Sequence, residues 1–287
     1  MRKIVRSIAA VTTLGISMNA VGEEFRYAAG LEFSSQSFDS TSIFTTVGPP
    51  PTTVVDSTSI DTDTIRLAGQ WYFAGLSDDR GPRARAAFVD RASTVALSYT
   101  WLDQDFANVR TSDDPFVPPG SFSASPSGGE INLGVRYVNR ESGWFGTASL
   151  SRADLDVSTN CGGGSVDATG WQVGLGKYFW PTTALQFAYG QVNADFSDSR
   201  SFAIAANHLG ALGGAWQYGA DVTFERRDAD IGGNNNNWSA AFSLYPNRDI
   251  EFGVRYLRDQ QEFNAGVDGY EGFASWYVSP RVRLAAR

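Results

Sequence analysis

Apolar and polar residues alternate along most of this chain. From Phe25 to Phe33 every second residue is apolar and the intervening residues are polar or small, and the same period recurs through the chain, less cleanly at 144–153 and 202–212. Successive side chains of a β-strand point to opposite faces, so this period predicts strands with one apolar face. The twelve predicted strands are 25–33, 65–73, 94–101, 131–137, 144–153, 171–176, 185–190, 202–212, 216–225, 238–244, 250–256 and 270–278.

The connections between the predicted strands alternate in length. Tight turns are expected at 139–143, 180–182, 213–215, 246–248 and 279–280. Longer polar segments are expected to be loops at 39–59, 103–128, 156–166, 193–201, 226–236 and 259–269. Short turns on one side and long loops on the other are typical of outer-membrane barrels, in which the short turns are periplasmic. None of the 11 prolines lies inside a predicted strand, as expected where every backbone N–H pairs with a neighbouring strand.

Aromatic residues, 13% of the chain, gather near the ends of the predicted strands. Near the short turns lie Phe73, Trp144, Phe179, Trp180, Trp216, Tyr245, Trp276 and Tyr277. Near the long loops lie Trp101, Trp171, Tyr189, Trp238, Tyr256 and Tyr270. A secreted β-sandwich also alternates, but it has no reason to place aromatic residues at both strand ends. Two aromatic girdles instead favour an all-β fold, a transmembrane antiparallel up-and-down β-barrel.

The first 22 residues have the features of a secretory signal peptide. A basic start at Arg2, Lys3 and Arg6 precedes a mildly apolar stretch, and Ala20-Val21-Gly22 supplies small residues for cleavage. We therefore expect 1–22 to be removed and 23–287 to form the barrel. Removal takes away three basic residues and no acid, so the net charge falls from −8 to −11. No apolar run of 18 residues follows, which argues against a transmembrane helix.

One connection on the short-turn side, residues 75–92, is longer than the others. Within it, residues 81–93, Gly-Pro-Arg-Ala-Arg-Ala-Ala-Phe-Val-Asp-Arg-Ala-Ser, resemble a segment at the same place in a family of outer-membrane porins of Gram-negative bacteria. The resemblance implies a pore-forming barrel in the outer membrane and does not specify the solute. Whether 83–91 forms a short helix that reaches into the lumen is left open.

The end of the chain departs from the pattern of that family, whose barrels usually finish on an aromatic residue. Here Val282, Leu284 and Ala286 alternate as if they began a thirteenth strand, and Arg287 follows. An odd number of strands is unusual for a bacterial single-chain barrel. Two alternatives follow: twelve strands close the barrel and the tail is periplasmic, or the chain is shortened from a fourteen-stranded type. We favour twelve.

Few residues are candidates for catalysis or cofactor binding. His208 is the only histidine, which excludes two-histidine metal sites, and its neighbours Asn207 and Leu209 favour a packed or interfacial role over that of a general base. Cys161 is the only cysteine and lies in a predicted outer loop, so an internal disulfide is excluded. We expect no enzymatic activity, no cofactor and no bound metal, although a barrel hydrolase built on His208 remains an alternative to test.

Charge narrows the range of partners. The acidic net charge opposes binding to nucleic-acid phosphates, so nucleic acid is excluded as a partner. Carboxylate pairs in the predicted outer loops fit two interpretations, solvated loop charge or divalent cations that bridge to lipopolysaccharide, and the first is favoured. These pairs are Asp61/Asp63, Asp113/Asp114 and Asp228/Asp230. The expected partners are outer-membrane lipid, lipopolysaccharide and small solutes or ions.

The inward-facing positions of the predicted strands carry charge. The candidate pore-lining residues are Arg26, Glu32, Arg66, Glu130, Arg136, Asp221, Glu225, Glu251, Arg255 and Glu271. Ions inside a barrel require water or each other, so these residues either line an open, narrow pore or form ion pairs that block it. The open pore is favoured. Acidic outer loops concentrate cations at the mouth. The sequence therefore predicts a passive porin for small hydrophilic solutes or ions with a weak cation preference; the alternative is a non-conducting structural or adhesive barrel.

Overall fold

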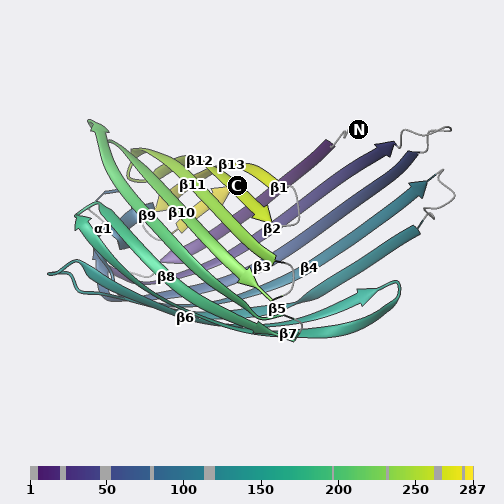
Figure 1. Ribbon diagram of the computed structural model, residues 1–287. Coiled ribbons are helices and arrows are strands. Elements are labelled where there is room, and N and C mark those ends of the chain that lie inside the picture. Colours follow the sequence, from purple (N-terminus) through teal and green to yellow (C-terminus); the bar gives the residue numbers. More distant parts are fainter. Residues whose placement is uncertain are drawn as a thin grey trace.

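The protein is a closed antiparallel β-barrel in which each strand pairs with its neighbours in the sequence (Figure 1). The computed structural model describes residues 6–19, 24–45, 53–77, 81–112, 120–195, 197–230, 233–261, 267–279 and 282–286. The strands in these ranges are β1 (Arg6–Asn19), β2 (Glu24–Thr45), β3 (Thr53–Ser77), β4 (Thr94–Ser112), β5 (Gly120–Val138), β6 (Trp144–Thr159), β7 (Gly162–Trp180), β8 (Thr183–Ala194), β9 (Ser199–Gly213), β10 (Trp216–Ala229), β11 (Gly233–Asn247), β12 (Ile250–Gln261), β13 (Val267–Ser279) and β14 (Val282–Ala286).

All twelve predicted strands are present, as β2 to β13. Two further strands close the barrel. The C-terminal alternation forms β14, and residues predicted as a signal peptide form β1, which pairs with β14 on one side and β2 on the other. The described residues therefore form fourteen strands. The predicted cleavage point after Gly22 lies outside the described residues, and removal of the leader remains a prediction.

The strands continue into several segments predicted as long loops, and these predictions were wrong about where the strands end. β2 and β3 pair as far as Thr45 and Thr53, so most of 39–59 is an extended hairpin. Serine, threonine and aspartate side chains are compatible with a strand that continues into water, because the backbone ladder needs no apolar face there. Pro126 lies within β5, where the pairing with β4 is interrupted, as its missing N–H requires.

The short turns at 139–143, 180–182 and 213–215 form where they were predicted, whereas the turn predicted at 246–248 lies at Arg248 and Asp249, and the turn predicted at 279–280 lies partly outside the described residues. The sequences of the turns explain their geometry. Asn139 accepts hydrogen bonds through its side-chain oxygen from the backbone N–H groups of Glu141 and Ser142, both at 3.1 Å, and Gly143 adopts a φ of 73°. Asn247 makes the same arrangement at the turn between β11 and β12. Its side-chain oxygen accepts hydrogen bonds from the backbone N–H groups of Asp249 and Ile250. Asparagine side chains thereby replace part of the backbone pairing at the turns.

The outer face of the barrel is apolar. Leu67 of β3, Leu97 of β4 and Leu150 of β6 are exposed by 50% or more. In each of these strands the residues that alternate with the outward-facing ones point to the lumen. A closed barrel with this exterior is suited to contact with lipid, because strand pairing satisfies backbone groups and the apolar side chains meet the hydrocarbon. The aromatic girdle prediction needs one correction: Tyr245 and Tyr277 are buried and face inward, so they do not belong to the girdle.

A helical segment interrupts the pattern between β3 and β4. Residues Arg83–Arg85 form the 3-10 helix η1, and Ala86–Val89 form one turn of α-helix, α1. Figure 1 places α1 at the end of the barrel where the short turns lie, opposite the end to which β2 to β5 extend. No helix in the described ranges is long and apolar enough to cross a bilayer.

Candidate functional site

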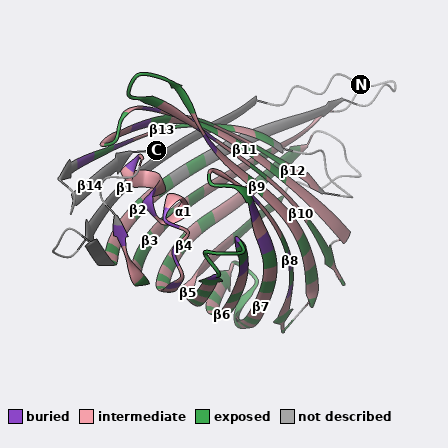
Figure 2. Ribbon diagram, turned by 90° about the vertical axis from the view of Figure 1, so that its left-hand side faces the viewer, coloured by how far each residue is buried: buried purple, intermediate pink, exposed green. Residues whose placement is uncertain are grey.

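The helical connection folds into the barrel. Figure 2 shows α1 inside the ring of strands, and we call residues 81–93 the luminal segment. The backbone N–H of Arg83 donates to the carbonyl of Arg248 at 3.0 Å, across the lumen from β3. The segment then returns to β4, where the carbonyl of Ser93 accepts a hydrogen bond from Phe73 at 3.1 Å. The question left open by the sequence is answered: this segment is helical and occupies the lumen.

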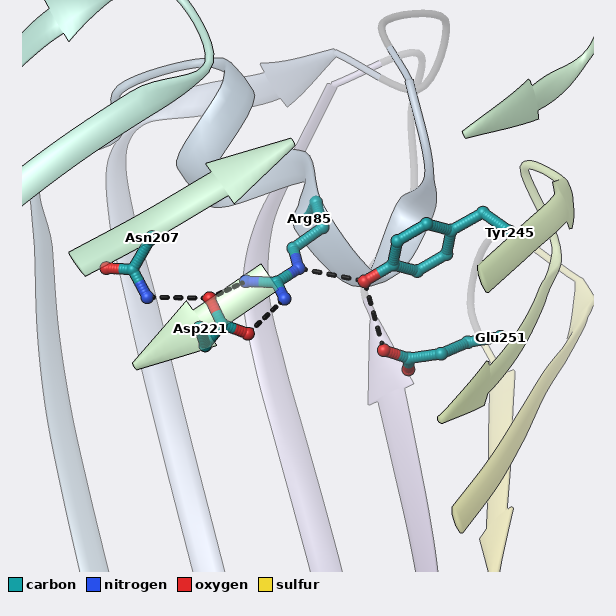
Figure 3. A network of polar contacts seen from close by, with 5 residues as sticks. All are labelled: Arg85, Asn207, Asp221, Tyr245 and Glu251. Carbon is teal, nitrogen blue, oxygen red and sulfur yellow. Dashed lines mark hydrogen bonds and ion pairs between the residues drawn. The ribbon is translucent and has the colours of Figure 1, made fainter. Parts of the chain in front are cut away.

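Arg85 joins the luminal segment to the opposite wall (Figure 3). Its guanidinium makes a two-pronged ion pair with Asp221 of β10, one arm of which is a 2.9 Å hydrogen bond from Nη1, and its Nε donates to the hydroxyl of Tyr245 at 2.8 Å. Asn207 donates to the same carboxylate at 2.7 Å, and the Tyr245 hydroxyl donates to Glu251 at 3.1 Å. Four strands, β9 to β12, therefore supply acceptors or support for one side chain.

The barrel wall leaves room for this arginine at a glycine. Gly219 lies two residues before Asp221 on β10 and faces inward. A Cβ added at Gly219 would lie 2.9 Å from the Arg85 guanidinium and 3.2 Å from the Tyr245 hydroxyl oxygen. The absence of a side chain at this position is thus what lets the guanidinium reach both partners.

The electrostatics of the pair favour the charged form of Arg85. Burial by itself lowers the pKa of Arg85, but the hydrogen bonds that its guanidinium donates to Asp221, together with the electrostatic interactions with Tyr245 and Asp221, outweigh it, so the pKa is raised above its usual value. Arg85 therefore keeps its charge at any physiological pH. Its side chain is 16% exposed and that of Asp221 is 27% exposed, so water still reaches the pair from the lumen.

A second arginine strengthens the same attachment. Arg83 forms an ion pair with Asp249, in the turn between β11 and β12, at 2.5 Å. Gly81, with a φ of 77°, lies against Gln217 and Leu209 of the facing wall. The start of the luminal segment is thus fixed to β9 through β12 by backbone and side-chain contacts together.

The other end of the segment packs on a different part of the wall. Phe88 lies against Tyr178 of β7 with ring centroids 5.3 Å apart, and the Tyr178 hydroxyl donates to the Phe88 carbonyl at 3.2 Å. Phe88 joins the buried cluster of Val138, Phe145, Tyr178 and Ala184, from β5 to β8. The guanidinium of Arg91 lies 4.9 Å above the Tyr178 ring. This contact is apolar at its centre, unlike the polar network around Arg85.

A third contact lies next to the strands that flank the segment. Ala86 and Ala92 are buried with Tyr72 and Leu76 of β3. The luminal segment therefore contacts β3, the β5–β8 wall and the β9–β12 wall. These contacts surround it at the short-turn end, so the described side chains narrow the lumen there from three directions.

Cavities lie on both sides of the segment, and two of them are lined entirely by described residues. The larger, about 450 Å³, lies between it and β2 to β5. Its polar lining includes Arg66, Gln70, Ser98 and Asn132. The smaller, about 180 Å³, lies on the other side and includes Arg85, Asp221, Ser243, Glu251 and Arg255 in its lining. The lumen is thus divided by the segment and holds polar space on both sides.

The charged residues predicted to line a pore fall into two sectors of the inner face. Glu32, Arg66 and Glu130 lie in one row across β2 to β5, as Glu32 pairs with Arg66 in the register and Thr100 separates Arg66 from Glu130. Arg136 of the same sector donates to the Tyr178 hydroxyl at 2.8 Å. The side chain of Arg26 lies outside the described residues. Asp221, Glu225, Glu251, Arg255 and Glu271 form the second sector, on β10 to β13.

Residues of the second sector form ion pairs with their own or neighbouring strands and also with the luminal segment. Arg255 and Glu271 face each other in the register and form an ion pair at 3.3 Å. Glu225 is paired with Arg227 of its own strand at 3.2 Å. Of this sector, Asp221 and Glu251 belong to the Arg85 network. An ion pair within the predicted set, Arg255–Glu271, is therefore present among the described residues, whereas Asp221 and Glu251 are connected to the luminal segment through Arg85 and Tyr245.

The strands between the two sectors present small, neutral side chains to the lumen. Gly170, Gly174 and Gly190 face inward, and side chains added there would meet Ser151, Thr147 and Gln172, among other atoms. Gln186 donates to Thr147 at 2.9 Å on the same face. Small polar surfaces of this kind leave space for water instead of filling the interior.

The remaining candidates lie away from the lumen. His208 faces outward, its Nδ1 2.8 Å from the Thr183 hydroxyl and its Nε2 3.3 Å from that of Tyr218. These partners are not the serine and carboxylate that a hydrolase requires. Cys161 is exposed in the turn between β6 and β7. No group of three or more metal-ligating side chains is present in the described part of the chain.

The paired aspartates behave differently from one another. Asp61 and Asp63 lie on β3 directly opposite Asp105 and Asp103 of β4, on the outer face and beyond Trp101. Asp228 forms an ion pair with Arg226 at 2.9 Å. Asp113 and Asp114 lie outside the described residues.

Comparisons with solved structures return outer-membrane barrels. The outer membrane protein Omp33 of Acinetobacter baumannii is 14% identical, with 81% of this chain and 95% of that chain covered and a TM-score of 0.48. The outer membrane channel DcaP of the same organism is 11% identical, with 98% and 96% covered and a TM-score of 0.35. No protein-family model and no curated protein matches the chain.

Sequence reasoning missed the residues that hold the luminal segment. Arg85 lies in the stretch that resembles a porin family, and Tyr245 was predicted to belong to a girdle. The sequence pattern predicted no supporting role for Gly219 or Asn207. Only the length of the 75–92 connection on the short-turn side indicated that something unusual lies there. The partner of Arg85 is 136 residues away, and strand order alone does not identify it.

Proposed function

We propose that this protein is an outer-membrane channel of a Gram-negative bacterium, through which small hydrophilic solutes or ions diffuse passively. The observation that carries the proposal is the inner face: charged residues on two sectors, separated by small neutral residues, enclose polar cavities of about 450 and 180 Å³. A barrel that served only as a membrane anchor would have no need of a water-accessible interior. The pore-lining residues proposed are the two charged sectors described above, with Arg26 included on its sequence pattern.

In this proposal the luminal segment is the gate of the channel. It contacts the wall on three sides at the short-turn end, which is the periplasmic end in barrels of this type. Solute entering from outside reaches the two cavities and is stopped at the segment. Flow then requires the segment to shift, and the contacts of Arg83, Arg85 and Phe88 set the energy of that shift.

Weak preference for cations is part of the same proposal. Exposed carboxylates such as Asp195 and Asp230 lie just beyond the outer ends of β8 and β10. A mouth of this charge raises the local concentration of cations and lowers that of anions. The effect is expected to be modest, because the lumen also carries arginines.

Export and membrane contact complete the proposal. Residues 1–22 are inferred to direct secretion and to be removed. Removal takes away β1, so in this proposal the mature barrel closes between β2 and β14, and N-terminal sequencing of protein from outer membranes should begin at Glu23. The apolar exterior contacts lipid, and the outward aspartates beyond Trp101 are positioned to meet lipopolysaccharide through divalent cations. Retention of residues 1–22 in the membrane form would overturn the inferred cleavage.

A second function is favoured by a specific observation. The three contacts of the luminal segment combine an ion-pair network with a buried aromatic cluster, which is the arrangement expected of a permanent plug. In that case the barrel is non-conducting and acts through its outer strands and loops, as a structural or adhesive protein.

Planar-bilayer recording separates the two functions. Purified wild-type protein is compared with the variant Arg83→Ala/Phe88→Ala, in which two of the contacts are removed. A channel gives stepwise conductance, larger or more frequent in the variant, and a reversal potential in a KCl gradient that indicates cation preference. Folded protein that shows no conductance in either form, at any voltage, contradicts the channel and supports the plugged barrel.

A further inference from the structure

The acceptors around Arg85 have the geometry of a binding site for a guanidinium group. The Asp221 carboxylate takes two N–H donors of the fork, and the Tyr245 hydroxyl takes the third at 2.8 Å. Paired donation of this kind is the preferred geometry between guanidinium and carboxylate groups, and a rounded ammonium group does not reproduce it.

The site is prepared by residues of the barrel wall. Asn207 holds the Asp221 carboxylate from β9 at 2.7 Å, and Glu251 orients the Tyr245 hydroxyl from β12 at 3.1 Å. The recess left by Gly219 receives the guanidinium. These groups belong to the rigid wall, so the site does not depend on the luminal segment for its shape.

The site is open to solutes from the lumen. The cavity of about 180 Å³ that includes Arg85, Asp221 and Glu251 in its lining also includes Arg255 and Ser243. At ~30 Å³ for each water molecule, this volume holds roughly six waters, enough for a small organic cation to approach the ion pair. Asp221 is 27% exposed, so its carboxylate is within reach of such a cation.

We propose that Asp221, Tyr245 and Glu251, with Asn207 and Gly219, form a binding site for small guanidinium-bearing solutes, and that Arg85 occupies this site as a tethered ligand. A free guanidinium competes with Arg85, detaches the start of the luminal segment and opens the lumen. The site thereby names a substrate class for the channel, and this last consequence rests on the channel function proposed above.

Binding is tested first, without any measurement of flow. Methylguanidinium is titrated by calorimetry into detergent-solubilised Arg85→Ala, in which the tethered ligand is absent. We expect saturable binding in Arg85→Ala and, because the charged hydrogen bonds are lost, binding weaker by about tenfold or more in Arg85→Ala/Asp221→Asn. Methylammonium is expected to bind Arg85→Ala less tightly than methylguanidinium does.

Two controls keep this test specific. Arg152→Ala removes an arginine that is paired with an exposed carboxylate, Asp154, on the outer face, and it should gain no saturable binding. Circular dichroism and heat-modified mobility on gels show that each variant is folded. Folded Arg85→Ala that fails to bind methylguanidinium, or that binds it no better than Arg152→Ala does, overturns the proposed site.

Gating is tested second, in planar bilayers with wild-type protein. Methylguanidinium, at the concentration that saturates Arg85→Ala, should raise open probability severalfold over sodium at the same ionic strength. If no variant conducts, the channel function fails while the calorimetric result still decides the binding site. If Arg85→Ala conducts but methylguanidinium leaves the wild type unchanged, competition with Arg85 is excluded.

Discussion

Arg85 and Asp221 form an ion pair across the lumen of the barrel, from a helical connection to the facing wall. The pair is partly screened by water, but both arms of the guanidinium are used and Tyr245 takes the remaining Nε donor. Breaking it leaves a carboxylate with only the Asn207 hydrogen bond among its described contacts. This ion pair and the hydrogen bond to Tyr245 attach the luminal segment to β10 and β11.

The recess at Gly219 should control that position. Gly219→Val places a side chain where the Arg85 guanidinium lies, 2.9 Å from a Cβ at this site, so the arginine must withdraw from Asp221. Bilayer recordings should then show higher open probability than the wild type. Gly134→Ala is the matched control: it is an inner-face glycine whose added Cβ meets nothing within 4 Å, and its recordings should match the wild type. Equal behaviour of both variants contradicts a role for the recess.

Phe88 should stabilise the closed form through packing instead of charge. Truncation in Phe88→Ala removes the contact with Tyr178 and is expected to cost about 1–3 kcal/mol of unfolding free energy, because the ring is only partly buried. Urea unfolding in lipid vesicles measures this, and conductance should rise in the same variant. Phe179→Ala, at a lipid-facing ring that is 55% exposed, should leave conductance unchanged. If Phe88→Ala leaves conductance unchanged, packing of Phe88 does not hold the luminal segment in place.

The strand pattern was predictable because lipid and water act on alternate residues. In Phe25 to Phe33 and the other alternating segments, the apolar residues are predicted to face outward and the polar or small residues to face the lumen. Strands β2 to β13 form in these segments. Strand ends were less predictable, since beyond the bilayer nothing requires an apolar face, and hairpins such as that between β2 and β3 continue in polar sequence.

The site was only half predictable for a related reason. Asp221, Glu251 and Arg255 could be placed on the inner face from the period of two. Their partner Arg85 lies in a segment with no such period, and its contact with β10 arises from folding of that segment across the lumen. Tyr245 was assigned to a girdle because it lies near a turn, whereas the alternation of β11 places it on the inner face, two residues after the buried Ser243.

Cys161 provides a test of orientation. The thiol is exposed in the turn between β6 and β7, on the side opposite the short turns, and should face outside the cell. A membrane-impermeant maleimide should therefore label intact cells that carry the wild-type protein. In a Cys161→Ser background, Ser142→Cys, in the exposed turn between β5 and β6, should be labelled only after the outer membrane is permeabilised. The reverse labelling pattern would show that the barrel is inserted with the opposite orientation.

The acidic and basic residues of the charged row on β2 to β5 should have opposite effects on the ratio of cation to anion permeability. Glu130 and Arg66 lie in the same row, separated in the register by Thr100, so both meet the same passing ion. Glu130→Gln removes a negative charge and should lower the ratio of cation to anion permeability, whereas Arg66→Gln should raise it. Each change is expected to be less than about tenfold, because water and salt screen charges that are separated by more than ~10 Å at 0.1 M salt. Reversal potentials in a KCl gradient give the ratio, and they should move less at 1 M salt. Shifts in the same direction for both variants would mean that this row does not face the conducting path.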